Sequence, residues 1–180
     1  MNYKNDFQKL IHDMIGEEYK LSKPTESFLH LFLVEIIKKI IEKSNDLLHP
    51  IDYENQSIKS FPNKNLTIRE LETSILLLFP KEISQFIIKN CMNMVKRKQK
   101  PIFSTSITET LIKNRIVYHI KIIKTSILFL TFILESLIAE IIDVYTQVEE
   151  DKLITKKGLK KVFEKDDELK KVLHVLNISI

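Results

Sequence analysis

The sequence predicts an all-α fold built from two successive triplets of helices. Glycine occurs only twice in 180 residues and proline five times, which argues against the many tight turns of a β-rich fold. Apolar residues recur at helical spacing, and the order short helix, long helix, short helix occurs in each half of the chain. The long helices are too apolar to bury their surfaces within one triplet, so the two triplets are expected to pack on each other.

The composition is that of a folded protein with a mild excess of positive charge. Hydrophobic residues make up 44% of the chain and charged residues 29%, a balance typical of folded domains. The 28 basic and 24 acidic side chains give a net charge of +4, which permits contact with a polyanion without requiring it. Cys91 is the only cysteine, so no disulfide can form within the chain, and its apolar neighbours favour a small buried side chain.

The first triplet begins with a short amphipathic helix, predicted from about residue 6 to 15 and ending near Gly16. Its long helix is predicted to start at a cap on Ser22 and to run to Leu48. Pro24 falls in the first turn of this helix, where its missing N–H has no helical partner to lose. A long, broadly apolar helix therefore forms the centre of the first half.

The third helix carries explicit start and stop signals. Thr67 can cap it while Glu70 reaches back to the backbone N–H of the cap, as in a capping box. Pro80 disfavours helical geometry in Phe79, so the helix should end there. Pro80 is also well placed to begin the next helix, predicted over residues 81–98.

The second half repeats this order of helices. A short helix is predicted over residues 107–114, a long one over 126–150 and a short one over 155–164. The segment "DELKKVLHVL" then closes the chain as a further amphipathic helix. The repeat lies in the lengths of the helices rather than in matching residues.

The long helix of the second half is apolar enough to mimic a membrane span. Glu135, Glu140 and Asp143 interrupt it, however, and an acid at the bilayer centre costs about 2.5–3.5 kcal/mol. A helix buried against protein on most sides, with one acidic stripe in water, is the better interpretation.

The sequence offers little for catalysis or for a metal site. It has no Gly-rich phosphate loop, no Cys/His cluster at metal-binding spacing, and no Ser or Cys nucleophile with an obvious base. The five histidines are scattered along the chain. We therefore expect no enzymatic activity, no cofactor and no metal.

The helices and their punctuation resemble those of two core histones fused in one chain. Ser22 to His49 resembles the long helix of histone 2B, "LTIRELETSILLLFP" its second loop and third helix, and "KEISQFIIKNCMNMVKRK" its C-terminal helix. From Phe103 onward the chain resembles histone 2A: "ILESLIAEIIDV" is similar to its central helix and "GLKKVFEKDDELKKVL" to its third helix and acidic turn. Together these motifs resemble the histone doublets of large DNA viruses.

The resemblance implies two histone folds that pair in a handshake within one chain. The histone 2B-like fold would span residues 1–98, the linker 99–102 and the histone 2A-like fold 103–180. Such a pseudodimer would join histone 3–histone 4 partners, expected to be a second doublet, and wrap double-stranded DNA as a nucleosome core component. Leu47, Leu48 and His49 are expected to contact histone 4. The implied location is the nucleus or a viral replication site, and the virion.

The resemblance also implies which residues bind DNA phosphates, without reading base sequence. Most of them precede or begin helices at the ends of the pseudodimer, where backbone N–H groups favour anions, whereas Lys113 and Arg115 close the short helix of the second fold. The expected set is Ser22, Lys23, Lys64, Asn65, Thr67, Lys113, Arg115, Lys121, Lys124, Thr125, Lys152, Thr155, Lys156 and Lys157.

Two departures from the family bear on DNA binding. An insertion of about ten residues lies within Ile51 to Pro62, and only Arg69, Arg97 and Arg115 remain as arginines. Because lysine is more strongly hydrated than arginine and lacks its planar fork, binding should be looser and more sensitive to salt. The basic segment Lys96–Pro101 joins the folds as a short solvated linker; a nuclear-import patch or an extra DNA contact is the alternative.

A set of acids matches the acidic patch of the nucleosome, a docking surface for arginine-bearing partners. By resemblance it comprises Glu82, Glu135, Glu140, Asp143, Asp166, Asp167 and Glu168. Asn90 stands where one further acid is expected, which reduces the patch at that edge. The alternative for these acids is a solubilising surface.

Two other functions stay open at this point. A pair of histone folds can be a subunit of a transcription complex, which acts by contact with proteins and has no need of the acidic patch. The chain can also be a helical interaction protein whose loop lysines are incidental. Of the three, only the nucleosome core component predicts a discrete length of DNA protected from nuclease in the presence of histone 3–histone 4 partners.

Overall fold

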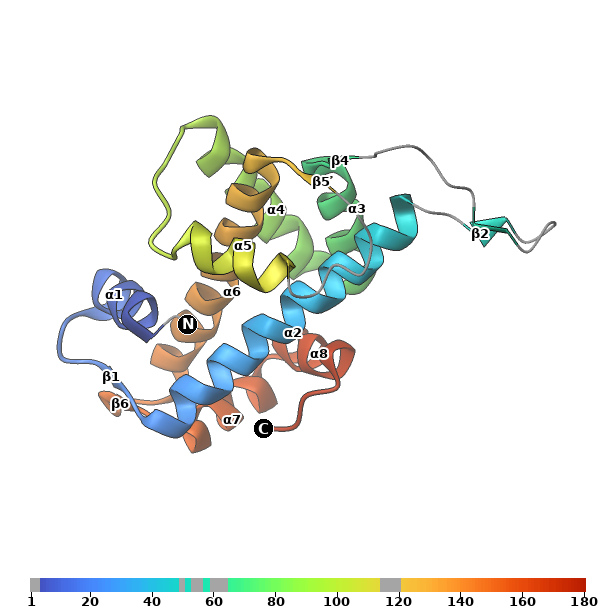
Figure 1. Ribbon diagram of the computed structural model, residues 1–180. Coiled ribbons are helices and arrows are strands. Elements are labelled where there is room, and N and C mark those ends of the chain that lie inside the picture. Colours follow the sequence, from blue (N-terminus) through green and yellow to red (C-terminus); the bar gives the residue numbers. More distant parts are fainter. Residues whose placement is uncertain (1–3, 49–50, 53–56, 59–64, 114–120) are drawn as a thin grey trace.

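The computed structural model describes residues 4–48, 51–52, 57–58, 65–113 and 121–180 (Figure 1). Within them the all-α prediction is confirmed, because every strand is only two residues long. The helices are α1 (Lys4–Ile15), α2 (Lys23–Leu48), α3 (Ile68–Leu78), α4 (Lys81–Lys96), α5 (Thr105–Lys113), α6 (Lys124–Val148), α7 (Lys156–Lys165) and α8 (Asp167–Leu176). Each predicted helix is present, with its ends within a few residues of the expected positions.

The start and stop signals of α3 act as predicted. The side chain of Thr67 accepts a hydrogen bond from the backbone N–H of Arg69, and the Thr67 N–H donates to Glu70 Oε2 at 2.9 Å, which completes the capping box. Phe79 has extended backbone geometry, and α4 begins directly after Pro80. The chain therefore turns sharply between α3 and α4.

The structure contains short strands that the sequence did not predict, and two pairs of them connect the two halves of the chain. They are β1 (Lys20–Leu21), β2 (Ile51–Asp52), β3 (Ser57–Ile58), β4 (Asn65–Leu66), β5 (Lys121–Ile122) and β6 (Leu153–Ile154). β1 pairs in parallel with β6, and β4 pairs in parallel with β5, whereas β2 and β3 form an antiparallel pair. Each parallel pair joins the segment before the long helix of one half to the segment after the long helix of the other.

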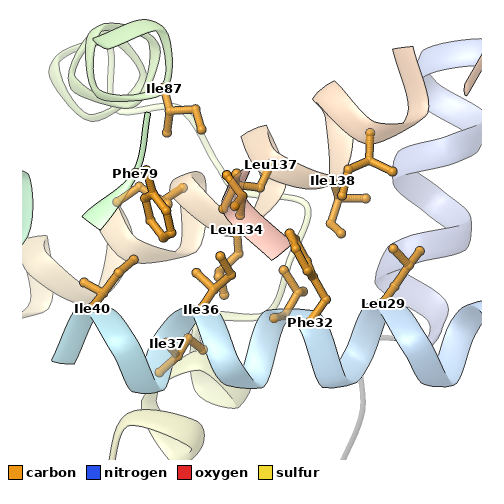
Figure 2. Packing of buried hydrophobic residues seen from close by; sticks show 14 of the residues in the cluster. Leu29, Phe32, Ile36, Ile37, Ile40, Phe79, Ile87, Leu134, Leu137 and Ile138 are labelled. Atoms are coloured by element: carbon orange, nitrogen blue, oxygen red, sulfur yellow. The ribbon is translucent and has the colours of Figure 1, made fainter. Parts of the chain in front are cut away.

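The two long helices share one core. α2 packs against α6 and also against α5, α7 and α8 of the second half, while α6 packs against α1, α3 and α4 of the first. Figure 2 shows Phe32 and Ile36 of α2 directed toward Leu134, Leu137 and Ile138 of α6. All five side chains are fully buried, so each half covers apolar surface that the other half alone would leave in water.

No helix in the described part of the chain is long and apolar enough to cross a membrane. α6 comes closest in sequence, but acids interrupt it and protein covers most of its surface. It lies behind α2 and α5 in Figure 1, with helices of both halves around it.

Candidate nucleic-acid and protein interfaces

The β1–β6 end of the molecule brings two helix starts together. The Lys20 N–H donates to the Lys152 carbonyl at 2.9 Å, and the Ser22 N–H donates to the Ile154 carbonyl at 3.0 Å. α2 begins just after β1 and α7 just after β6, so the starts of these helices lie side by side (Figure 1). Six predicted phosphate-binding residues meet here: Ser22, Lys23, Lys152, Thr155, Lys156 and Lys157.

Side chains at this end orient the helix starts and leave the lysines in solvent. Thr155 Oγ1 accepts from the Gly158 N–H at 3.1 Å, and the Ser22 hydroxyl lies 2.8 Å from that of Thr25. Lys152 lies 4.0 Å from a carboxylate oxygen of Glu18, and the side chains of both are at least half exposed. The surface attraction between such groups is weak and screened by salt, so it leaves the Lys152 ammonium available to an anion.

The β4–β5 end has the same arrangement with the two halves exchanged. Asn65 pairs with Lys121 and Leu66 with Ile122, and the buried Ser126 hydroxyl donates to the Leu66 carbonyl at 3.0 Å. The predicted phosphate-binding residues at this end are Asn65, Thr67, Lys121, Lys124 and Thr125. Lys113 is exposed at the last residue of α5, whereas Lys64 and Arg115 lie outside the described residues.

Tyr145 and Gly158 hold the loop that carries Lys152, and sequence analysis missed both. The buried Tyr145 hydroxyl donates to the carbonyls of Asp151 and Leu153, each at 3.2 Å. A Cβ at Gly158 would lie only 2.7 Å from the Tyr145 ring, so glycine is needed for this close approach. Burial raises the pKa of Tyr145 to about 12, which keeps its hydroxyl a donor.

The Tyr145→Phe substitution should loosen this loop while retaining the packing of the ring. Loss of the hydroxyl is expected to lower the free energy of unfolding by about 1 kcal/mol. It should also speed hydrogen exchange of the Lys20 and Ser22 amides, whose acceptors lie on the β6 side of the pair. Exchange at the β4–β5 end is the internal control. If the Lys20 and Ser22 amides exchange at the same rate in the variant as in the parent chain, the hydroxyl does not hold the loop.

Five of the predicted acids line one groove, which we call the acidic groove. It has a volume of about 400 Å³ and lies where α4, α6 and the turn between α7 and α8 meet. Its acidic members are Glu82, Glu140, Asp143, Asp166 and Glu168. Asp167 is exposed in the first turn of α8 and does not line the groove.

Negative charge in the acidic groove is only partly compensated. Burial, together with the nearby charges of Asp143 and Asp166, raises the pKa of Glu140. Lys171 donates to Glu168 Oε1 at 3.0 Å, and Asp166 accepts from the Leu169 N–H at 2.8 Å as the cap of α8. Glu140 therefore stays close to two other carboxylates, Asp143 and Asp166, whose charges oppose its ionisation.

Glu135 was predicted to belong to the acidic patch, but it is buried. Its side chain is 7% exposed, and its carboxylate accepts from the Phe103 N–H at 2.5 Å instead of facing solvent. The next amide along the chain, the Ser104 N–H, donates to Asp6 Oδ2 of α1 at 2.7 Å. Burial raises the pKa of Glu135 to about 7 although the Phe103 hydrogen bond favours the ionised form. Glu135 thus anchors the segment that joins the halves.

The predicted contact with histone 4 is only partly exposed. Leu48 is buried in the core of this chain at 5% exposure, so its side chain is not available to a partner, whereas Leu47 is 36% exposed. His49 lies outside the described residues. Leu76 and Leu77 of α3 are 51% and 60% exposed. Sequence analysis did not name them, although three successive leucines exceed what one inward stripe of a helix requires.

Cys91 is buried, as its apolar neighbours predicted. Its Sγ lies 3.5 Å from the Ser136 hydroxyl, and burial raises the pKa of the thiol to about 12, which keeps it protonated and unreactive. Within the described residues, no three His, Cys, Asp or Glu side chains are grouped so that they could hold a metal ion.

We compared the sequence with models of known protein families and with curated proteins. Neither comparison gives a match for this chain.

Proposed function

We propose that the chain is a fused histone 2B–histone 2A pair that acts as a nucleosome core component. The observation that carries the proposal is the reciprocal pairing of β1 with β6 and of β4 with β5, at opposite ends of the molecule (Figure 1). A handshake of two histone folds requires this pairing, because the first loop of each fold must meet the second loop of the other. Residues 1–98 and 103–180 would be the two folds.

The chemistry of both ends suits the phosphates of DNA. Each end combines exposed lysines with the starts of two helices, whose backbone N–H groups and dipoles favour anions. No base-reading element is needed, because phosphate contacts fix the position of DNA without reading its sequence. Since the donors are mainly lysines, binding should be looser and more sensitive to salt than that of cellular histones.

Partner binding would use an exposed apolar surface at the end of α2 and on α3. Leu47, Leu76 and Leu77 leave a third or more of their surface in water, and α2 and α3 pack against each other. Large apolar side chains left in water on neighbouring helices are typical of protein interfaces. By resemblance, its partner would be the histone 4 portion of a second doublet.

Reconstitution on DNA tests the proposal directly. The chain, histone 3–histone 4 partners and DNA are mixed at high salt and dialysed to low salt, and the product is digested with micrococcal nuclease. A discrete protected length that requires the chain is expected. Unprotected DNA together with a stable complex of proteins would instead favour a histone-fold subunit of a transcription complex.

Matched lysine variants locate the phosphate contacts. Lys156→Gln/Lys157→Gln removes two charges at the β1–β6 end, and Lys81→Gln/Lys89→Gln removes two exposed charges from α4. Each lost phosphate contact reduces the slope of log affinity against log salt by about 0.9, so the first pair should reduce it by about 1.8. The second pair should leave the slope unchanged. Equal slopes for the two variants would contradict the assigned DNA-binding end.

A further inference from the structure

A cavity beside the acidic groove is not explained by the proposed DNA contacts. It has a volume of about 350 Å³ and lies between α1, α4 and α6. Its apolar lining comes from Leu10, Met14, Phe86, Met94, Ile102 and Ala139, and its polar lining comes from Asn90, Glu135, Ser136, Glu140 and Asp143. The volume is at the lower end of the range of ligand pockets in proteins, and one long aliphatic side chain would occupy only part of it.

Two large apolar side chains that line this cavity are partly exposed to water. Phe86 is 51% exposed and Met14 is 37% exposed, and both line the cavity. On the α6 side, the small residues Ser136 and Ala139 leave room for an entering group. Exposed apolar surface around a hollow indicates a binding site, and the unbranched Met14 and Met94 side chains can adapt to different occupants.

The cavity is continuous with the acidic groove. Phe86, Glu140 and Asp143 line both of them. Neither Glu140 nor Asp143 forms an ion pair with any residue that the structure describes. The Asp143 carboxylate accepts a hydrogen bond from the neutral Gln147 amide at 3.0 Å, which leaves its charge in place. A molecule that fills the cavity therefore places its neighbouring atoms beside two carboxylates without an ion-pair partner, and complementarity favours positive charge on those atoms.

We propose that the cavity and the acidic groove together bind a short segment of a protein partner that carries a long apolar side chain within a few residues of arginine. The apolar side chain enters the cavity between Met14 and Phe86, and the guanidinium group lies against Glu140 and Asp143. This inference rests on the proposed docking role of the acidic groove and adds a second determinant of specificity to it. Arginine suits the site because its planar group pairs with two carboxylate oxygens at once.

Synthetic peptides test the two determinants separately. The probes are fluorescein-labelled dodecapeptides of Gly and Ser that carry two arginines and one leucine, with one to four residues between them. Matched peptides have Ala for Leu or Gln for Arg. Binding to the full chain is followed by fluorescence anisotropy at low salt. At the best spacing, Leu→Ala should weaken binding about tenfold, since a buried leucine contributes strongly to affinity, and Arg→Gln should abolish it.

Variants of the chain show where each determinant binds. Ala139→Leu narrows the cavity and should weaken the leucine peptide about tenfold without changing the alanine peptide. Glu140→Gln/Asp143→Asn should weaken both arginine-bearing peptides, whereas Glu150→Gln/Asp151→Asn, which removes two exposed carboxylates just after α6, should weaken neither. If Ala139→Leu fails to fold, Phe86→Ser serves in its place, because half of the Phe86 side chain is already in water.

Three results would overturn the inference, and each has a different meaning. Equal affinity of the leucine and alanine peptides at every spacing would remove the cavity from the site but retain docking at the acidic groove. Failure of every arginine peptide to bind would remove the docking role of the groove itself. A dimer in analytical ultracentrifugation that Ala139→Leu or Phe86→Ser dissociates would assign the cavity to a second copy of this chain. Nuclease protection tests DNA wrapping independently of all three.

Discussion

The Phe32→Ala substitution is expected to lower the free energy of unfolding by about 3–5 kcal/mol. Phe32 lies in α2 and is fully buried. Its ring centroid lies 6.3 Å from that of Phe28 in the same helix and 6.0 Å from that of Phe163 in α7. Truncation therefore opens a cavity at the contact between the two halves, where surrounding rings cannot collapse fully into the space.

Urea denaturation of the full chain measures this effect. Because the halves share one core, the parent chain and the variant should each unfold in one transition when followed by circular dichroism. Leu31→Ala is the matched control, since Leu31 is the neighbouring residue of α2 and is 49% exposed; its cost should stay within about 1 kcal/mol. Two separate transitions, or equal costs for the two variants, would contradict a core shared by both halves.

The Glu135→Gln substitution should stabilise the chain at alkaline pH by up to about 3 kcal/mol. Burial raises the pKa of Glu135 from the ordinary value of 4.5 to about 7. Between these two pH values the folded chain binds more protons at this site than the unfolded chain, so stability falls as pH rises from 4.5 to 7. Glutamine removes this loss and keeps an oxygen that can accept the hydrogen bond from Phe103.

The measurement is the difference in unfolding free energy between the variant and the parent chain at several pH values. It should be near zero at pH 4.5 and reach its maximum above pH 7, because Asp6, Lys9 and the other titrating groups are common to both chains. Glu150→Gln, which removes an exposed carboxylate, should give a difference near zero throughout. A Glu135→Gln difference that does not change with pH would show that the carboxylate is ionised without cost in the fold.

Local signals were sufficient to predict the helices and most of their ends. The capping box of Thr67 and Glu70 and the stop at Pro80 depend only on neighbouring residues, and α3 begins and ends where they predict. The same holds for α7, which begins after a Thr155 cap. Helical periodicity also identified α2 and α6 as the central helices, because their apolar surface is too broad for exposure to water.

Features made by residues distant in sequence could not be predicted in this way. A two-residue strand such as β1 has too few positions to show a period of two, so its pairing with β6 becomes visible only in three dimensions. The resemblance to the acidic patch grouped Glu135 with surface acids, yet its partner Phe103 lies 32 residues away along the chain. The role of Tyr145 likewise depends on the loop that folds back over it.

The shared core, together with the reciprocal strand pairs, makes the covalent connection between the halves unnecessary for their cohesion once the chain has folded. Each half supplies one strand to each of the two parallel pairs. A cut between Gln99 and Lys100 would therefore leave the two halves bound to each other in the same fold. The continuous backbone acts earlier, during synthesis, by making each half meet its own counterpart before any other. Every molecule then carries the two halves in equal number, and neither can be exchanged for one from elsewhere.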